Sequence, residues 1–169
     1  EEASIKHKLF KSRIRQFLFY YFFPYYSFDI DNTLVYFLAG RYEFRDKGID
    51  VFISALGRLN ERLKKENSDK TIVTFFWIPG NVKAIKQDLL ENKTYFVDLK
   101  DSVDDMAEEI KNKITYLLIS KKDINAKALF NDEFLQETTP KIRRIARKGI
   151  VPLSTHDLYN EDSETILNA

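Results

Sequence analysis

The sequence predicts an α/β fold in which a strand, a helix and a second strand are followed by a large helical segment, so that helix dominates overall. The first observation is an apolar run, Thr33–Ala39, which is followed by an amphipathic stripe. The second is another β-branched and aromatic run that begins at Thr71. The third is the stretch 81–148, where many charges alternate with apolar residues at helical spacing. This order predicts a βαβ unit with parallel strands.

The residues before the first strand predict an amphipathic helix from Ile5 to Phe22. Its apolar stripe consists of Ile5, Leu9, Phe10, Ile14, Phe17, Leu18 and Tyr21. The aromatic run at its end is too short for a membrane span, which needs about 20 apolar residues, and Pro24 interrupts it. We therefore expect no membrane role, and we expect the aromatic end to pack on another domain or on a second copy.

The βαβ unit is predicted to begin with a strand over Thr33–Ala39 and a turn at Gly40. We then expect a helix over Lys47–Lys65, with Asp46 as its N-cap. The apolar stripe of this helix consists of Val51, Phe52, Ala55, Leu56, Leu59 and Leu63.

Arg41, at the carboxyl edge of the predicted strand, and Lys47, at the N-terminus of the predicted helix, are candidates for binding phosphate. A lysine in the first turn of a helix opposes the macrodipole, at about 0.3–1 kcal/mol, unless an anion is bound there. Helix N-termini bind phosphate through free N–H groups, while Arg adds a bidentate fork and Lys a point charge. The alternative is that both cations are ordinary solvated charges in a loop that also holds Glu43, and the local pattern leaves both interpretations open.

The second strand is predicted over Thr71–Ile78, with Trp77 in the core. Beyond it we expect three helices, the first beginning with Val82 and Ile85 and the third spanning roughly Glu133 to Lys148. The second carries an acidic group made of Asp104, Asp105, Glu108 and Glu109. Because apolar residues from Val103 to Leu118 recur at helical spacing, we interpret that group as an acidic first turn and expect no metal site.

A basic cluster lies near the end of the third predicted helix. It consists of Arg143, Arg144, Arg147 and Lys148. Cations at a helix C-terminus complement the macrodipole, and this is the favoured interpretation. A ligand such as a sugar phosphate is the alternative.

Composition and charge exclude several classes of function. Lys plus Arg (27) nearly balances Asp plus Glu (26), so no overall field attracts nucleic acid or an anionic membrane. The chain has no cysteine, which excludes disulfides and thiolate metal sites and is compatible with the cytoplasm. Any affinity for phosphate must therefore be local.

The strings AGRYEF, at 39–44, and KGIDVFISALGRLN, at 47–60, resemble the glycogen synthase family of retaining GT-B glycosyltransferases. They match the opening of that family's Rossmann-like C-terminal domain. TIVTFFWIPG, at 71–80, resembles its second strand, and Pro152–Asp157 a Pro-x-x-Thr-His segment that closes its helical insertion. The fold class implied is α/β, a partial Rossmann-like βαβ unit with a large helical insertion, helix-rich overall.

The resemblance also implies a division of the chain into four parts. Residues 1–32 form a helical segment that leads from an N-terminal domain, and residues 33–80 form the βαβ start of the nucleotide-sugar-binding domain. Residues 81–150 form the helical insertion, and residues 151–169 return to the Rossmann-like domain. Eukaryotic members use longer insertions to join subunits, so the resemblance makes a homo-oligomer through this insertion an expectation. Packing of the insertion helices on one another is the alternative.

For function, the resemblance implies glucosyl transfer from a nucleotide sugar to an α-1,4-glucan. The Arg and Lys of the family motif match Arg41 and Lys47, which would hold the donor diphosphate, and Gly40 would let the backbone approach it. The donor is UDP-glucose or ADP-glucose, and no other cofactor is implied. The location implied is cytoplasmic.

The sequence departs from the family pattern in one respect that concerns catalysis. The family carries a Glu-x7-Glu motif late in the C-terminal domain, and this chain has no two glutamates at that spacing. The family's N-terminal domain is also not represented. We therefore expect a middle portion of an enzyme that is inactive alone, with no catalytic residue in this chain. An interdomain or oligomerisation module, and another GT-B enzyme with a different acceptor, are the alternatives.

Overall fold

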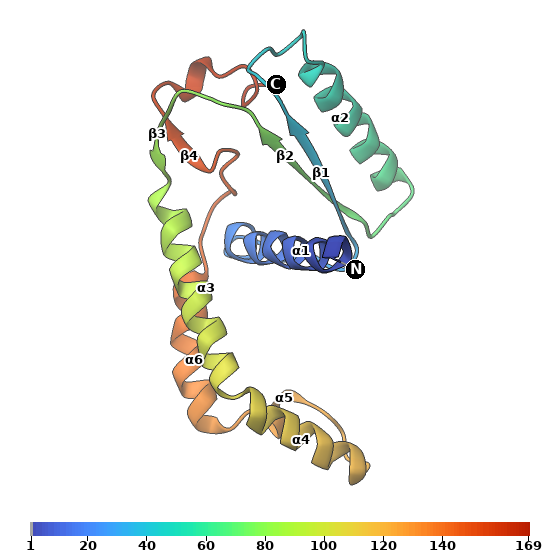
Figure 1. The fold of residues 1–169 in the computed structure, drawn as a ribbon, viewed down its shortest axis with the longest axis vertical. Coiled ribbons are helices and arrows are strands. Elements are labelled where there is room, and N and C mark those ends of the chain that lie inside the picture. Colours follow the sequence, from blue (N-terminus) through green and yellow to red (C-terminus); the bar gives the residue numbers. More distant parts are fainter. Residues whose placement is uncertain (1) are drawn as a thin grey trace. The chain divides into compact units, whose positions relative to one another are not determined.

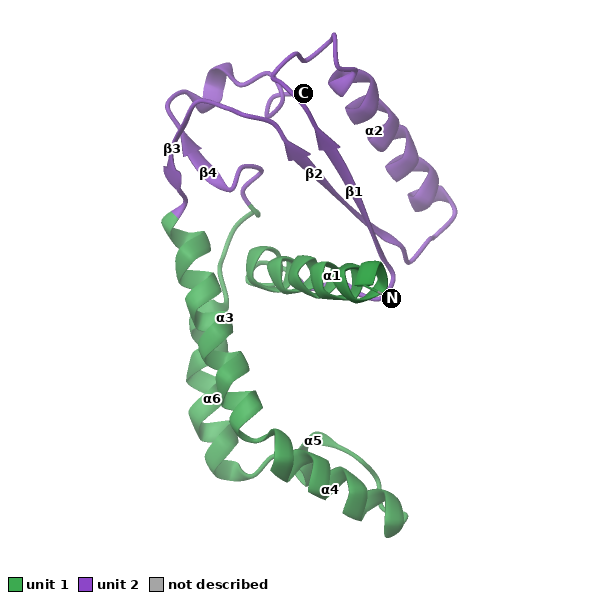
Figure 2. Cartoon of the chain, viewed as in Figure 1, with its two compact units in different colours: residues 1–26, 87–151 green, residues 27–86, 152–169 purple. Residues whose placement is uncertain are grey.

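The computed structural model describes residues 2–169 and confirms a mixed α/β chain that is rich in helix (Figure 1). The chain forms two compact units, which alternate along the sequence (Figure 2). Unit 1 contains the N-terminal residues up to Tyr26 together with Gln87–Val151. Unit 2 contains Ser27–Lys86 and Pro152–Ala169.

Unit 2 holds the predicted βαβ arrangement. Strand β1 (Thr33–Ala39) and strand β2 (Thr71–Trp77) pair in parallel, with Thr33 opposite Thr71 and Ala39 opposite Trp77. Helix α2 (Ile49–Lys65) connects them. The prediction of β1 is confirmed at both ends, and β2 ends one residue before the predicted Ile78.

Aromatic residues determine how the two strands pack. The ring of Phe52, on α2, lies 5.8 Å from that of Phe76 on β2, so α2 covers the side of the sheet to which Phe76 points. Successive residues of a strand point to opposite faces. Phe75 therefore points away from α2, and its ring stacks at 5.3 Å on that of Phe37, its partner in the register.

A second, antiparallel pair of strands lies in unit 2 and was not predicted. Strand β3 (Val82–Ile85) pairs with β4 (His156–Leu158), so the prediction that Val82 and Ile85 begin a helix is wrong. Short apolar stretches fit either element, and here a partner strand more than 70 residues away decides the outcome. A short 3₁₀ helix, η1 (Glu161–Ser163), follows β4.

Lys86, directly after β3, ties these elements together. Its Nζ lies 3.0 Å from Asp157 Oδ1 and 3.0 Å from Glu161 Oε1. Burial alone would lower the pKa of Lys86, but hydrogen bonds to the two carboxylates outweigh burial and raise it. The charged lysine therefore holds β3, β4 and η1 to one another.

Unit 1 is helical. Its helices are α1 (Glu2–Tyr21), α3 (Gln87–Asp105), α4 (Ala107–Ile119), α5 (Ala126–Leu129) and α6 (Asp132–Ile145). Helices α3 and α6 lie side by side (Figure 1). They are antiparallel, because Lys141, late in α6, donates a 2.6 Å hydrogen bond to Ser102, late in α3, whereas Arg147 beyond α6 reaches Asn92, early in α3.

Helix α1 packs on α3 through its aromatic end. Leu18 is fully buried, and the ring of Phe19 stacks 6.0 Å from that of Phe96 on α3. The N-terminal half of α1 is not covered in this way, since Ile5 and Phe10 of the predicted stripe are exposed. Within the described part of the chain, no helix combines the length and the apolar character that a membrane crossing requires.

The predicted second helix of the insertion is interrupted at Met106. Helix α3 ends at Asp105 and α4 begins at Ala107, with Glu108 and Glu109 in its first turn as expected. Within residues 2–169, no group of three or more His, Cys, Asp or Glu side chains is arranged to hold a metal ion.

Candidate donor-phosphate site

The candidate site begins where β1 ends. The N–H of Gly40 donates a 3.2 Å hydrogen bond to the carbonyl of Trp77, which extends the β1–β2 ladder by one residue. Arg41 follows at the carboxyl edge of β1, with 78% of its side chain exposed. A Cβ at Gly40 would meet no other atom within 4 Å, so the backbone here is open to a ligand.

The segment from Glu43 to Gly48 forms a single closed turn before α2. The N–H of Lys47 donates to the carbonyl of Glu43 (3.0 Å), and that of Gly48 to Arg45 (2.9 Å). The N–H of Ile49 reaches back to Phe44 (3.0 Å), while Gly48 is left-handed, with φ of 67°. These bonds form a Schellman motif, which ends one turn at Gly48 before α2 starts.

This turn corrects two sequence predictions about α2. The helix starts at Ile49 and its N-cap is Gly48, so Asp46 is not the N-cap and Lys47 does not lie in the first turn. The physical reason is the left-handed backbone at Gly48, which an α-helix cannot include. The acidic residue in the first turn is instead Asp50.

The N-terminus of α2 is also less available to an anion than the sequence suggested. The N–H groups of both Ile49 and Asp50 point to the carbonyl of Phe44, at 3.0 and 3.4 Å. That of Phe52 is bonded to Gly48 within the helix. Free N–H groups are what make a helix N-terminus attract phosphate. Affinity for phosphate at this position must therefore come mainly from the two cations.

The structure brings Arg41 and Lys47 to the same carboxylate. Arg41 Nε lies 3.5 Å from Oε1 of Glu43, and Lys47 Nζ lies 3.6 Å from Oε2 of that residue. The side chain of Lys47 is 43% exposed and that of Glu43 is 35% exposed. The two predicted cations therefore face one negatively charged group at the protein surface, which is the geometry that two cations need to share a ligand anion.

Tyr42 anchors the same loop to the C-terminal segment. Burial and a hydrogen bond to the Glu164 carboxylate raise the pKa of Tyr42, while a hydrogen bond from the backbone of Ile166 opposes that shift. Tyr42 therefore ties this loop to the C-terminal segment, whereas the side chain of Arg41 beside it is 78% exposed.

Sequence reasoning missed Glu43 as part of the site. The signal was present, because Glu43 precedes Lys47 by four residues, the spacing at which oppositely charged side chains meet on a helical turn. It also missed Asp50, whose Oδ1 is buried and finds no hydrogen-bond partner among the described residues.

Trp77 was predicted in the core, but it is 64% exposed beside Phe37 at the end of β2, so that prediction is wrong.

The basic cluster at the end of α6 separates into two kinds of residue. Arg143, Arg144 and Lys148 are exposed, whereas Arg147 is held by Glu91 at 2.8 Å and by Asn92 at 3.1 Å. Helix α6 ends at Ile145, so Arg147 and Lys148 lie beyond it and the predicted end was too late. Arg147 therefore joins α3 to the end of α6 and is not available as a phosphate ligand.

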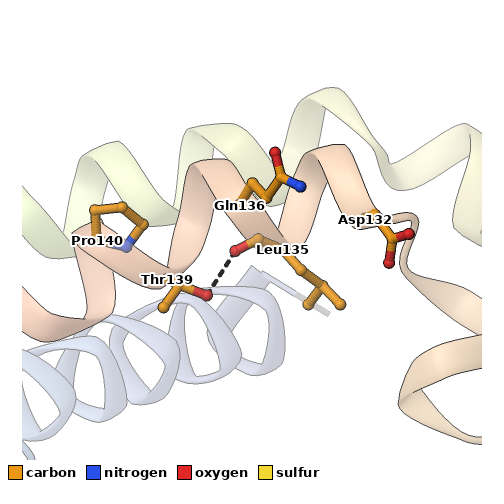
Figure 3. A pocket seen from close by; sticks show the side chains of 5 residues that line it. All are labelled: Asp132, Leu135, Gln136, Thr139 and Pro140. Carbon is orange, nitrogen blue, oxygen red and sulfur yellow. Dashed lines mark hydrogen bonds between the residues drawn. The ribbon is translucent and has the colours of Figure 1, made fainter.

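An open groove lies along α6 in unit 1. Figure 3 shows the residues that line it, all from this helix: Asp132, Leu135, Gln136, Thr139 and Pro140. Thr139 donates a 2.5 Å hydrogen bond to the carbonyl of Leu135. Pro140 has no N–H and leaves the carbonyl of Gln136 without its usual helical donor. Asp132 is the only charged residue among the described residues that line the groove, whereas two cations meet at Glu43.

Comparisons with known proteins identify the family. The chain is 31% identical over 166 residues to a glycogen [starch] synthase of Neurospora crassa, covering 96% of this chain and 24% of that protein. It is 29% identical to the liver glycogen [starch] synthase of Mus musculus and 29% identical to isoform 1 of Saccharomyces cerevisiae, again over 96% of this chain. It spans about a quarter of the length of these relatives. The family model described as glycogen synthase matches residues 2–169, and the chain therefore belongs to the glycogen synthase family.

Proposed function

We propose that this chain supplies part of the donor site of a retaining glucosyltransferase, which moves glucose from a nucleotide sugar to an α-1,4-glucan. The observation that carries the proposal is the convergence of Arg41 and Lys47 on one carboxylate at the carboxyl edge of β1. Ligands of open α/β sheets bind beyond the carboxyl ends of strands, which is where these cations lie. Membership of the glycogen synthase family supports the assignment of the substrate class.

The two cations would act on the leaving group. When the bond between glucose and the nucleoside diphosphate breaks, negative charge grows on the diphosphate oxygens. Fixed cations near that charge lower the barrier because they interact more strongly with the transition state than with the intact donor. The space beside Gly40 is open, since a Cβ there would meet no atom within 4 Å, and this would let the diphosphate approach the backbone.

The remaining parts of the reaction lie outside the residues assigned here. We place no catalytic residue in this chain, and we assign the reading of the base, uridine or adenine, and the glucan acceptor to other parts of the protein. The donor is UDP-glucose or ADP-glucose, and no further cofactor is proposed. A cytoplasmic location is part of the same proposal.

A second role, as an interdomain or subunit contact, is supported by exposed apolar side chains in unit 1. On α1 these are Ile5 (67% exposed), Leu9 and Phe10, and on α4 they are Leu118 and Ile119. Apolar groups in such a number are usually covered in a working protein. This role is compatible with the donor site, because the residues concerned belong to a different unit.

The test of the donor site is binding of the nucleoside diphosphate by the natural-length protein. We expect Arg41→Ala and Lys47→Ala each to weaken binding of the cognate nucleoside diphosphate, measured by calorimetric titration. Arg45→Ala is the matched control, because Arg45 is exposed in the same loop and should leave binding unchanged. Equal affinities for all four proteins would refute the donor-phosphate role of Arg41 and Lys47.

A further inference from the structure

We propose that Glu43 is a placeholder for the donor diphosphate, an internal carboxylate that occupies the cation pair until the ligand displaces it. The inference rests on the proposed function and adds a residue that tunes affinity at that site. Its basis is that each of the two carboxylate oxygens of Glu43 faces a different cation.

The distances show that the bridge is loose. Charge-assisted hydrogen bonds between nitrogen and a carboxylate are typically about 2.7–2.9 Å long. The contacts of Glu43 are 3.5 Å to Arg41 and 3.6 Å to Lys47, so the pairs are attracted by charge without well-formed hydrogen bonds. A phosphate group, which carries more charge and can approach more closely, therefore has an advantage over this carboxylate.

The exchange requires motion of a side chain only. The backbone of Glu43 is fixed on both sides, since its N–H donates to the carbonyl of Arg41 (2.8 Å) and its carbonyl accepts from Lys47 (3.0 Å). Its side chain is partly exposed and can rotate into solvent without disturbing the turn. Exposed side chains change rotamer in picoseconds to nanoseconds, so the exchange is fast compared with turnover.

The consequence is that Glu43 opposes the ligand while keeping the site ordered. In the free protein the carboxylate limits repulsion between Arg41 and Lys47 and holds them near one point. When the ligand binds, these two ion pairs are lost and the carboxylate remains nearby as a like charge. When the diphosphate product leaves, Glu43 returns to the cations, which favours release.

The experiment is a calorimetric titration of inorganic pyrophosphate into the natural-length protein and its variants. We expect Glu43→Gln and Glu43→Ala to bind pyrophosphate roughly 3- to 30-fold more tightly than the unaltered protein, from the loss of two exposed ion pairs. Glu61→Gln is the matched control, because Glu61 is an exposed glutamate of α2, about 18 Å along the helix from its start, and should change affinity less than twofold.

The outcomes separate this inference from the proposed function. If Arg41→Ala and Lys47→Ala do not weaken pyrophosphate binding, the phosphate site itself is wrong. If they weaken it but both Glu43 variants bind as the unaltered protein does, or more weakly, the site stands and the placeholder is overturned. In the Arg41→Ala background, Glu43→Gln should give a smaller gain in pyrophosphate affinity, because one of the two ion pairs of Glu43 is already absent.

Discussion

Arg147 Nε donates a 3.1 Å hydrogen bond to Oδ1 of Asn92, a side chain of α3 that is only 2% exposed. The same guanidinium donates to Glu91 at 2.8 Å, and the backbone N–H of Arg147 donates to the carbonyl of Pro24 at 2.7 Å. Arg147, two residues beyond the end of α6, thus satisfies the carbonyl oxygen of a buried amide and joins three segments of unit 1.

Removal of this side chain should destabilise unit 1. Arg147→Ala leaves the buried Asn92 carbonyl oxygen without its donor, and an unsatisfied buried polar group costs about 1–3 kcal/mol. Urea unfolding should show that loss, whereas Arg144→Ala, which removes an exposed arginine three residues earlier, should stay within about 0.5 kcal/mol of the unaltered chain. Similar midpoints for both variants would contradict the structural role of Arg147.

The partner Glu91 predicts a pH dependence on the acid side. Hydrogen bonds from Arg147 and then Gln87 lower the pKa of Glu91 below its ordinary value of 4.5. A carboxylate whose pKa is lowered by folding stabilises the folded state above that ordinary value, and the contribution is lost as the pH falls through the lowered pKa. Urea midpoints should therefore converge for the unaltered chain and Glu91→Gln as pH falls from 7 to below 4.5. A difference that persists at low pH would show that the charge of Glu91 is not its source.

Gly48 gives a prediction about the turn before α2. An added Cβ at this position would meet no atom within 4 Å, so the cost of Gly48→Ala is purely the left-handed backbone, about 1–2 kcal/mol. Asp46→Ala should be nearly neutral, since Asp46 caps no helix, whereas loss of a real N-cap costs about 1 kcal/mol. Thermal unfolding of the two variants distinguishes the observed turn from the predicted one.

Loss of either cation should reduce catalysis more than stability. In an assay of the proposed glucosyl transfer by the natural-length protein, we expect Arg41→Ala or Lys47→Ala to lower kcat/KM by roughly 30- to 1,000-fold, which corresponds to about 2–4 kcal/mol of transition-state stabilisation. The unfolding temperature should change little, because both side chains are exposed and their pairs with Glu43 are loose. Normal turnover in both variants would contradict the assignment.

The parts of the fold that the sequence predicted are those fixed by local pattern. The strand Thr33–Ala39 and the end of α2 at Lys65 follow from a β-branched run and from helical spacing, and both were predicted to the residue. The pair β3–β4 was missed because neither strand is recognisable without the other, and the register partners Ile85 and His156 are 71 positions apart in the sequence. The exposure of Trp77 was missed because a strand pattern cannot tell which end of a sheet is covered.

The sequence predicted which two cations form the candidate site, but it did not predict the turn that holds them. Arg41 and Lys47 were identified from a motif, but the start of α2 depends on the left-handed backbone of Gly48, which a glycine permits without requiring. The role of Glu43 depends on a turn that closes over four residues, and charge spacing alone does not distinguish that turn from an open loop.

The position of β3 and β4 explains how chain length can vary between them. Helix α3 begins directly after Lys86, and the chain comes back from unit 1 only a few residues before Thr155, whose carbonyl accepts a 3.1 Å hydrogen bond from the N–H of Lys86. The two points at which the chain leaves and rejoins unit 2 are therefore held together by the hydrogen bond between Lys86 and Thr155. Because loop closure depends only weakly on loop length, residues gained or lost inside this segment need not disturb the strands at its ends. An insertion of any size has to preserve the pairing of β3 with β4 and the hydrogen bond between Lys86 and Thr155, whereas the helices between them can change.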